Sequence, residues 1–109
     1  MLVQNKIEKE DIVAIKFASG EEVIARYLGE DVAAYNVDKI MSIVAGQRGI
    51  ALSPFMFGVE LDEKGYPKTP CTLLKASILV IAPASPDITQ QFKTSISGIQ
   101  QPKKSSIIL

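Results

Sequence analysis

The first regular feature of the chain is an alternation of apolar and polar side chains. In residues 12–18, the apolar side chains of Val13, Ile15 and Phe17 alternate with polar or small ones such as Lys16. A period of two is typical of a strand that buries one face and leaves the other in water, because successive side chains of a strand point to opposite faces. The pattern therefore predicts a half-buried strand.

A second alternating stretch follows a break at Gly20. Here Val23, Ala25 and Tyr27 lie on one predicted face, with polar side chains on the other. Glycine reverses the chain direction at little steric cost, because it tolerates backbone conformations that other residues avoid. The two stretches are therefore expected to form a hairpin.

The segment 32–44 fits two descriptions. Its β-branched residues favour a strand, whereas Val37, Ile40, Met41 and Val44 follow the i, i+3, i+4, i+7 spacing of a helix. Periodicity leaves both interpretations open.

Two further strands are predicted on either side of a loop. Residues 50–61 are rich in apolar side chains but contain Pro54, which cannot donate to a strand ladder, so a bent or interrupted fourth strand at an edge or a bulge is expected. The Gly- and Pro-containing segment 62–70 predicts a surface loop. The apolar run 73–82 is short for a helix and predicts a buried fifth strand.

The composition changes after this fifth strand. Ser85, Pro86 and Asp87 supply an N-cap hydroxyl, a proline suited to the first helical turn and an acid near the positive helix end. These residues predict a short amphipathic helix that ends near Gly98, followed by a flexible tail. Its apolar face is expected to contain Ile88, Phe92, Ser95 or Ile96, and Ile99. One domain is expected, with β structure in residues 1–85 and the helix and tail in residues 86–109.

Composition and charge exclude several classes of function. The 109 residues contain no histidine and one cysteine, and 12 basic side chains balance 12 acidic ones. Zinc, haem and histidine-based catalysis are therefore excluded, and Cys71 has no histidine to activate it, so we expect neither an enzyme nor a cofactor. A net charge of zero is unlike the basic surface of a protein that coats duplex DNA.

The location expected from the sequence is the cytoplasm. The first residues, MLVQNKIEKED, lack the apolar stretch of a secretory signal. The longest apolar runs are also far shorter than the roughly 20 residues that span a bilayer. We therefore expect no contact with a membrane.

Two stretches resemble the sequence motifs of the Sm-like proteins, the family of LSm and Hfq rings. Residues 13–31, VAIKFASGEEVIARYLGED, resemble the first motif, and residues 74–81, LKASILVI, resemble the second. The positions that carry the first match are Gly20, Val23, Ala25, Tyr27 and Asp31. The similarity is greatest to small phage-encoded or marine metagenomic members. Five short strands already suggest a small barrel, and the resemblance implies a mainly β fold, a strongly bent five-stranded open barrel of SH3 type, here with a short C-terminal helix.

The resemblance also implies a function and a site. Sm-like proteins form rings, so about five to seven copies of this chain are expected to pair edge to edge as a homo-oligomer. Single-stranded RNA would bind at a pore-side pocket and serve RNA metabolism or regulation. Carried over by position, the pocket residues are Asp31, Tyr35, Asn36, Lys75 and Ser77. A tyrosine can stack on a base, an asparagine can read a base edge and a lysine can meet a phosphate.

Under a second hypothesis, the chain forms the ring but does not bind RNA. The family has an asparagine where Tyr35 stands, and an Arg-Gly pair where Lys75 and Ala76 stand. The chain would then be an oligomeric module for interaction with other proteins or for assembly. In that case Asp31 caps a turn, Tyr35 packs against the barrel, Asn36 takes an unfavourable backbone conformation and Lys75 is a solvated surface charge.

Overall fold

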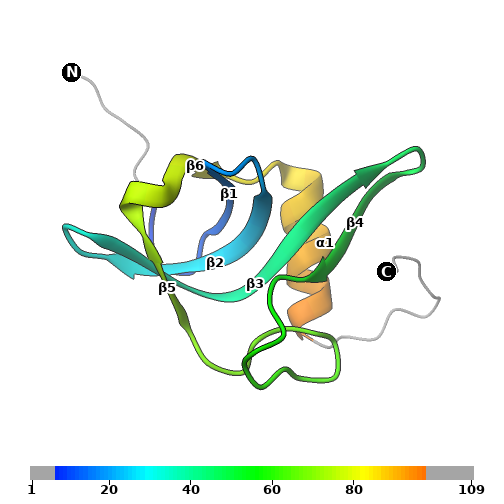
Figure 1. The fold of residues 1–109 in the computed structure, drawn as a ribbon. Coiled ribbons are helices and arrows are strands. Elements are labelled where there is room, and N and C mark those ends of the chain that lie inside the picture. The colour runs from blue at the N-terminus through cyan, green and yellow to red at the C-terminus, as the bar shows by residue number, and fades with distance from the viewer. Residues whose placement is uncertain (1–6, 98–109) are drawn as a thin grey trace.

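The computed structural model describes residues 7–97, and these form one antiparallel sheet with a helix (Figure 1). The strand order is β4-β3-β2-β1-β6, and β5 pairs with β3 beside this path. The elements are β1 (Ile12–Phe17), β2 (Glu22–Glu30), β3 (Ala34–Gly46), β4 (Gly49–Pro54), β5 (Cys71–Leu74), the 3-10 turn η1 (Lys75–Ser77), β6 (Ile78–Pro83) and α1 (Pro86–Ser97).

The first predicted hairpin is confirmed. β1 and β2 pair in the register that places Ile15 opposite Val23, and both side chains are fully buried. Gly20 in the connecting turn has φ +99°, a left-handed conformation that glycine adopts without strain. The glycine and the alternation together therefore fix the register of this hairpin.

The ambiguous third segment is a strand, and a bulge explains its helix-like spacing. Along β3, three steps from Asp38 to Met41 match two steps from Arg26 to Ile24 on β2, and Lys39 at the irregularity has φ +55°. An extra residue changes which face the following side chains point to. Apolar side chains therefore recur at intervals of three and one, as they would on a helix.

The predicted fifth strand is wrong in two respects. The run 73–82 is interrupted by η1, so that β5 pairs with β3 whereas β6 pairs with β1. The second part is also not buried: β6 is an edge strand, and Leu79 and Val80 are 65% and 54% exposed. The described chain therefore has six strands rather than five. Apolar composition alone does not distinguish an edge strand from a central one.

The fourth strand is shorter than the predicted segment 50–61. β4 ends at Pro54, as expected for a proline on an edge strand, and the chain then bends. Leu61 makes only an isolated bridge to Pro67. The following loop also contributes to the core, because Tyr66 is only 1% exposed.

The sheet buries apolar side chains on both faces. One cluster contains Val13, Ile15, Val23, Ala25, Tyr27, Val37, Ile40 and Leu73. The other contains Ile12, Ile24, Met41, Tyr66 and Phe92, with Ile88 and Ile96 of α1 packed against it. The helix and the loop that carries Tyr66 therefore cover one face of the sheet.

The helix prediction is confirmed at its start. Ser85 caps α1: its Oγ accepts a hydrogen bond of 3.3 Å from the backbone N of Ile88, and its carbonyl accepts one of 2.8 Å from Thr89. Ile88, Phe92 and Ile96 form the inward face, whereas the predicted Ile99, Gly98 and tail lie outside the described residues.

The mainly β architecture is thus confirmed, but the strands do not close into a barrel. Within residues 7–97, β4 and β6 lie at opposite ends of the strand order and do not pair with each other. The end of β1 is nevertheless linked to the residue that follows β4, because the rings of Phe17 and Phe55 stack with centroids 5.8 Å apart. Both end strands keep an unpaired edge.

Candidate functional site

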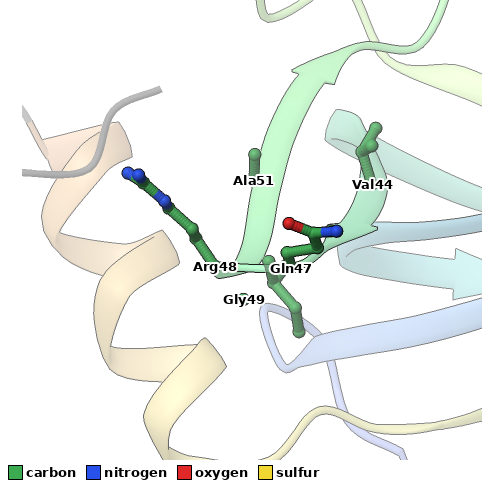
Figure 2. A pocket seen from close by; sticks show the side chains of 7 residues that line it. Val44, Gln47, Arg48, Gly49 and Ala51 are labelled. Carbon is green, nitrogen blue, oxygen red and sulfur yellow. The ribbon is translucent and has the colours of Figure 1, made fainter.

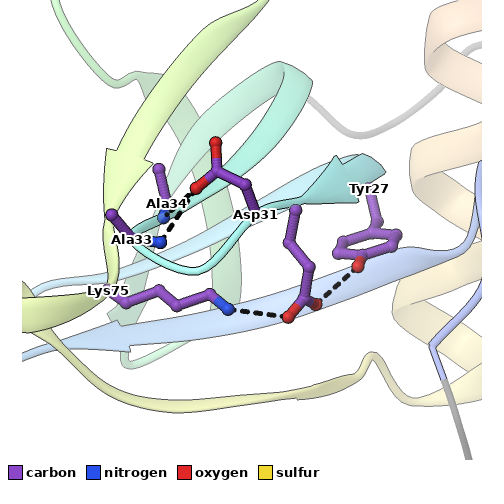
Figure 3. A network of polar contacts seen from close by, with 6 residues as sticks. Tyr27, Asp31, Ala33, Ala34 and Lys75 are labelled. Carbon is purple, nitrogen blue, oxygen red and sulfur yellow. Dashed lines mark hydrogen bonds and ion pairs between the residues drawn. The ribbon is translucent and has the colours of Figure 1, made fainter.

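Two predicted site segments that are far apart in the sequence meet at one side of the sheet. The turn between β2 and β3 lies next to η1, because the backbone N of Lys75 donates a 2.9 Å hydrogen bond to the carbonyl of Ala33. Pairing of β5 with β3 then continues this contact, with Tyr35 opposite Leu73. The sheet therefore brings Lys75 to the side chains of the β2–β3 turn (Figure 3).

Lys75 and Tyr35 form the centre of this arrangement, which we call the Tyr35–Lys75 site. The Nζ atom of Lys75 lies 4.9 Å from the centroid of the Tyr35 ring, within the range of a cation–π contact. The same ammonium donates a 2.8 Å hydrogen bond to Glu30 Oε2. The site therefore contains a cation, an aromatic face and a carboxylate, and all three are partly exposed.

Glu30 is held from two sides. Its Oε1 accepts a 2.6 Å hydrogen bond from the hydroxyl of Tyr27, while Oε2 accepts the bond from Lys75 (Figure 3). The hydrogen bond from Lys75 is the main cause that lowers the pKa of the Glu30 carboxyl, and the same bond raises the pKa of Lys75. Burial of the ring, and then the bond to Glu30, raise the pKa of Tyr27 to about 12. The pair is therefore ionised at neutral pH, and Tyr27 stays protonated.

Asp31 shapes the turn that presents these groups. Its Oδ1 accepts 2.9 Å hydrogen bonds from the backbone N–H groups of Ala33 and Ala34. These two bonds lower the pKa of the Asp31 carboxyl, because they stabilise the charged form. Asp31 thus caps the turn, as the second hypothesis expected, and its carboxylate also lies in the electrostatic field of Lys75.

The remaining two predicted residues lie further from the centre. Asn36 is the next residue along β3, and its Oδ1 accepts a 3.2 Å hydrogen bond from the hydroxyl of Thr72 on β5. Ser77 ends η1, and its hydroxyl donates a 2.9 Å bond to the carbonyl of Leu74. The structure therefore gathers Asp31, Tyr35 and Lys75, whereas the side chain of Asn36 points to the opposite face of the sheet, and the Ser77 hydroxyl is used within the 3-10 turn.

Sequence reasoning missed two residues of this site, Tyr27 and Glu30. The alternation and the motif resemblance place Tyr27 on one face of a predicted strand and give it no role in the site, yet its hydroxyl reaches Glu30. A signal for Glu30 existed, because it immediately precedes Asp31 at the end of a predicted strand. Its contact with Lys75 depends on the long-range pairing of β5 with β3, which local patterns do not encode.

Another hollow lies at the tip of the β3–β4 hairpin, which projects away from the sheet on the side opposite the β2–β3 turn (Figure 1). It is formed by that hairpin alone, and its lining includes Val44, Gln47, Arg48 and Ala51 (Figure 2). Arg48 is the one charged side chain among these lining residues. Groups from different elements converge at the Tyr35–Lys75 site but not here, so the Tyr35–Lys75 site is the stronger candidate.

Comparison of the sequence with protein-family models and with curated proteins finds no match. The resemblance to Sm-like proteins therefore rests on the motif positions alone and stays a prediction. Among residues 7–97, no helix is long and apolar enough to cross a membrane. Within the same residues, no three histidine, cysteine or carboxylate side chains come together as a set of metal ligands.

Proposed function

We propose that this chain is a ring-forming Sm-like protein of the cytoplasm that binds single-stranded RNA at the Tyr35–Lys75 site and catalyses no reaction. The observation that carries the proposal is the Lys75 ammonium over the face of Tyr35, 4.9 Å from the ring centroid. Proteins that bind single-stranded nucleic acid combine aromatic side chains with nearby cations, because every base has a π-face and every phosphodiester group carries a negative charge.

Asn36 would add the ability to distinguish bases. Its Oδ1 is used by Thr72, and no residue of the described chain accepts a hydrogen bond from its amide nitrogen. Because adjacent residues of a strand point to opposite faces, this amide donor would meet the edge of a base other than the one stacked on Tyr35. RNA would thus contact Tyr35 through stacking and Asn36 through the edge of a different base, and a phosphate would reach Lys75 only in competition with Glu30.

Both edges of the sheet support the homo-oligomeric part of the proposal. β4 and β6 each have one unpaired side among the described strands, and both carry exposed apolar side chains: Ile50 is 55% and Leu79 is 65% exposed. Unpaired, apolar strand edges favour pairing with another chain. Because the two edges belong to different strands, pairing one with the other is head to tail, which gives a ring when the rotation closes.

The RNA site is tested by fluorescence anisotropy with short uridine-rich and adenine-rich RNAs at two salt concentrations. Stacking contributes about 1–3 kcal/mol per base, so Tyr35→Ala should weaken binding by about 5- to 150-fold. The double variant Tyr35→Ala/Lys75→Ala should abolish binding and leave the oligomer mass unchanged. Lys68→Ala is the control for charge, since Lys68 pairs with Glu60 outside the site. Binding that survives the double variant would exclude this pocket.

The ring is tested by the mass of the assembly in solution. Leu79→Lys places a charge on the β6 edge, and we expect it to shift the population toward monomers in analytical ultracentrifugation. Val32→Lys is the matched control, because Val32 is 93% exposed but lies in the β2–β3 turn and belongs to neither edge strand. Equal masses for wild type and Leu79→Lys would show that β6 is not part of the contact.

A second candidate function is an oligomeric assembly module that interacts with other proteins and does not bind RNA. It is favoured by one observation: Lys75 is already paired with Glu30, at 2.8 Å, and is therefore neutralised. Under this candidate, RNA would fail to bind at about 100 μM protein, a concentration at which ordinary non-specific phosphate contacts are half-saturated, while the assembly remains intact.

A further inference from the structure

The position of Glu30 follows from an irregularity at the end of β2. The register between β2 and β3 shifts between Tyr27 and Gly29, and Gly29 has φ +150°. In a regular strand, residues three apart point to opposite faces. The shift changes this relation, so that the Tyr27 hydroxyl and the Glu30 carboxylate meet at 2.6 Å.

The same carboxylate occupies the position where a ligand anion would meet Lys75. Glu30 Oε2 lies 2.8 Å from Lys75 Nζ, the distance of a charge-assisted hydrogen bond. An RNA phosphate that approaches Lys75 therefore meets a neutral pair rather than a free cation. To bind there, the phosphate must replace Glu30 and approach a second negative charge.

We propose that Glu30 is a specificity-determining residue of the Tyr35–Lys75 site. Because Glu30 neutralises Lys75, the affinity of a ligand depends on its stacking on Tyr35 rather than on its phosphate charge. The inference rests on the proposed RNA-binding function and deepens it. A base can still reach the part of the Tyr35 ring that Lys75 and the core cluster leave exposed, because Tyr35 is only partly buried. A polyanion without bases should bind weakly, because the only lysine of the site is already paired with Glu30.

The salt dependence of binding provides a specific signature. Binding of a single strand weakens with salt, with a slope of about −0.7 for each phosphate that is neutralised and so releases its counterions. In the wild type, Lys75 is neutralised by Glu30 and contributes little to this slope. In Glu30→Gln the lysine is free, so the slope should steepen by about 0.7 for each Lys75 that meets a phosphate.

The experiment compares two ligands of equal length, an oligouridylate and an oligonucleotide with the same phosphates but abasic sugars, on wild type and Glu30→Gln. Wild type should bind the oligouridylate well and the abasic strand poorly. Glu30→Gln should bind the abasic strand about 1.4- to 5-fold more tightly per engaged lysine, the range expected when an exposed ion pair no longer competes. The ratio of its affinities for the oligouridylate and the abasic strand should therefore be smaller than in the wild type.

Two further variants separate this effect from general changes in charge or folding. Glu60→Gln removes one carboxylate from another exposed lysine pair, Lys68–Glu60 at 3.2 Å, and should leave both affinities and the salt slope unchanged. Tyr27→Phe keeps the charge of Glu30 but removes the hydrogen bond that holds it, so it should shift affinity in the same direction by a smaller factor. It also provides a test should Glu30→Gln fold poorly.

Each outcome has one meaning. If wild type binds the oligouridylate and Glu30→Gln has the same affinities and slope, the role of Glu30 is wrong while the proposed function stands. If neither protein binds either ligand, the proposed function is wrong, and the role of Glu30 falls with it. If Glu60→Gln gives the same gain as Glu30→Gln, the effect is one of net charge and the inference is overturned.

Discussion

Replacement of Phe92 by alanine is the most direct test of how α1 is held on the sheet. The Phe92 side chain is fully buried, and its ring meets that of Tyr66 edge-on, with centroids 5.8 Å apart and planes at 84°. Truncation of a buried phenylalanine costs about 3–5 kcal/mol in free energy of unfolding, because apolar contacts are lost and a cavity remains. An edge-to-face pair adds about 0.5–1.5 kcal/mol beyond the buried area, so we expect the upper half of that range.

Urea unfolding measures this loss. With an m-value of about 2 kcal/mol per molar urea, a loss of about 4 kcal/mol lowers the midpoint by about 2 M. Far-ultraviolet circular dichroism and tyrosine fluorescence should report the same transition, at one fixed protein concentration, since assembly would make stability depend on concentration.

Gln91→Ala provides the control, because Gln91 precedes Phe92 on the same helix but is exposed. It should change the free energy of unfolding by less than about 0.5 kcal/mol. A midpoint for Phe92→Ala within about 0.5 M urea of wild type, at unchanged m-value, would refute the packing of α1 described above.

Two further predictions concern the loop and the tyrosines. Gly65 has φ +96°, and an added Cβ would lie 3.0 Å from Pro54 Cγ. Gly65→Ala should therefore lower the free energy of unfolding, measured by thermal unfolding, by more than about 1 kcal/mol. The control is Gly58→Ala, which should be neutral or stabilising because no atom lies within 4 Å of its added Cβ. Burial raises the pKa of Tyr66 and, together with the bond to Glu30, raises that of Tyr27 to about 12. Unfolded tyrosines release their protons near pH 10, earlier than the folded ones, so stability should be complete below pH about 10 and fall as the pH rises toward 12. A urea midpoint that stays constant between pH about 9 and about 11 would contradict this, and Tyr27→Phe should reduce the decline.

The sequence predicts those parts of the fold that depend on local pattern. The β1–β2 hairpin follows from alternation around Gly20, and the start of α1 follows from Ser85, Pro86 and Asp87. In these places the same few residues determine both the pattern and the structure. For these two elements, local propensity and periodicity are therefore sufficient to predict the structure.

The missed features are those that distant parts of the chain impose. Alternation in β2 predicts one buried face, yet Ile24 between Val23 and Ala25 is also fully buried, because α1 and the loop around Tyr66 cover the second face. The bulge at Lys39 likewise interrupts the two-residue alternation of β3, so that its apolar residues follow a helix-like spacing. No local pattern states which strand will lie at an edge, so the exposure of β6 was not foreseen.

The candidate site shows the same division. The positions of Asp31, Tyr35 and Lys75 came from a motif resemblance, and the structure brings these three side chains together. The resemblance gave no reason to include Glu30, because its role depends on the register shift after Tyr27 and on η1. The RNA-binding role itself stays a prediction until the affinities are measured.

The pairing of β1 has a consequence for how the chain folds during synthesis. β1 is flanked by β2, which follows it at once, and by β6, where Val13 pairs with Pro83 near the end of the described chain. A nascent chain that has reached only β4 would therefore leave β1 with an open side, and the face later covered by α1 bare. Such partly synthesised chains expose strand edges and apolar surface, the features that recruit chaperones or neighbouring nascent chains. Completion of this sheet has to wait until residues 78–83 have left the ribosome.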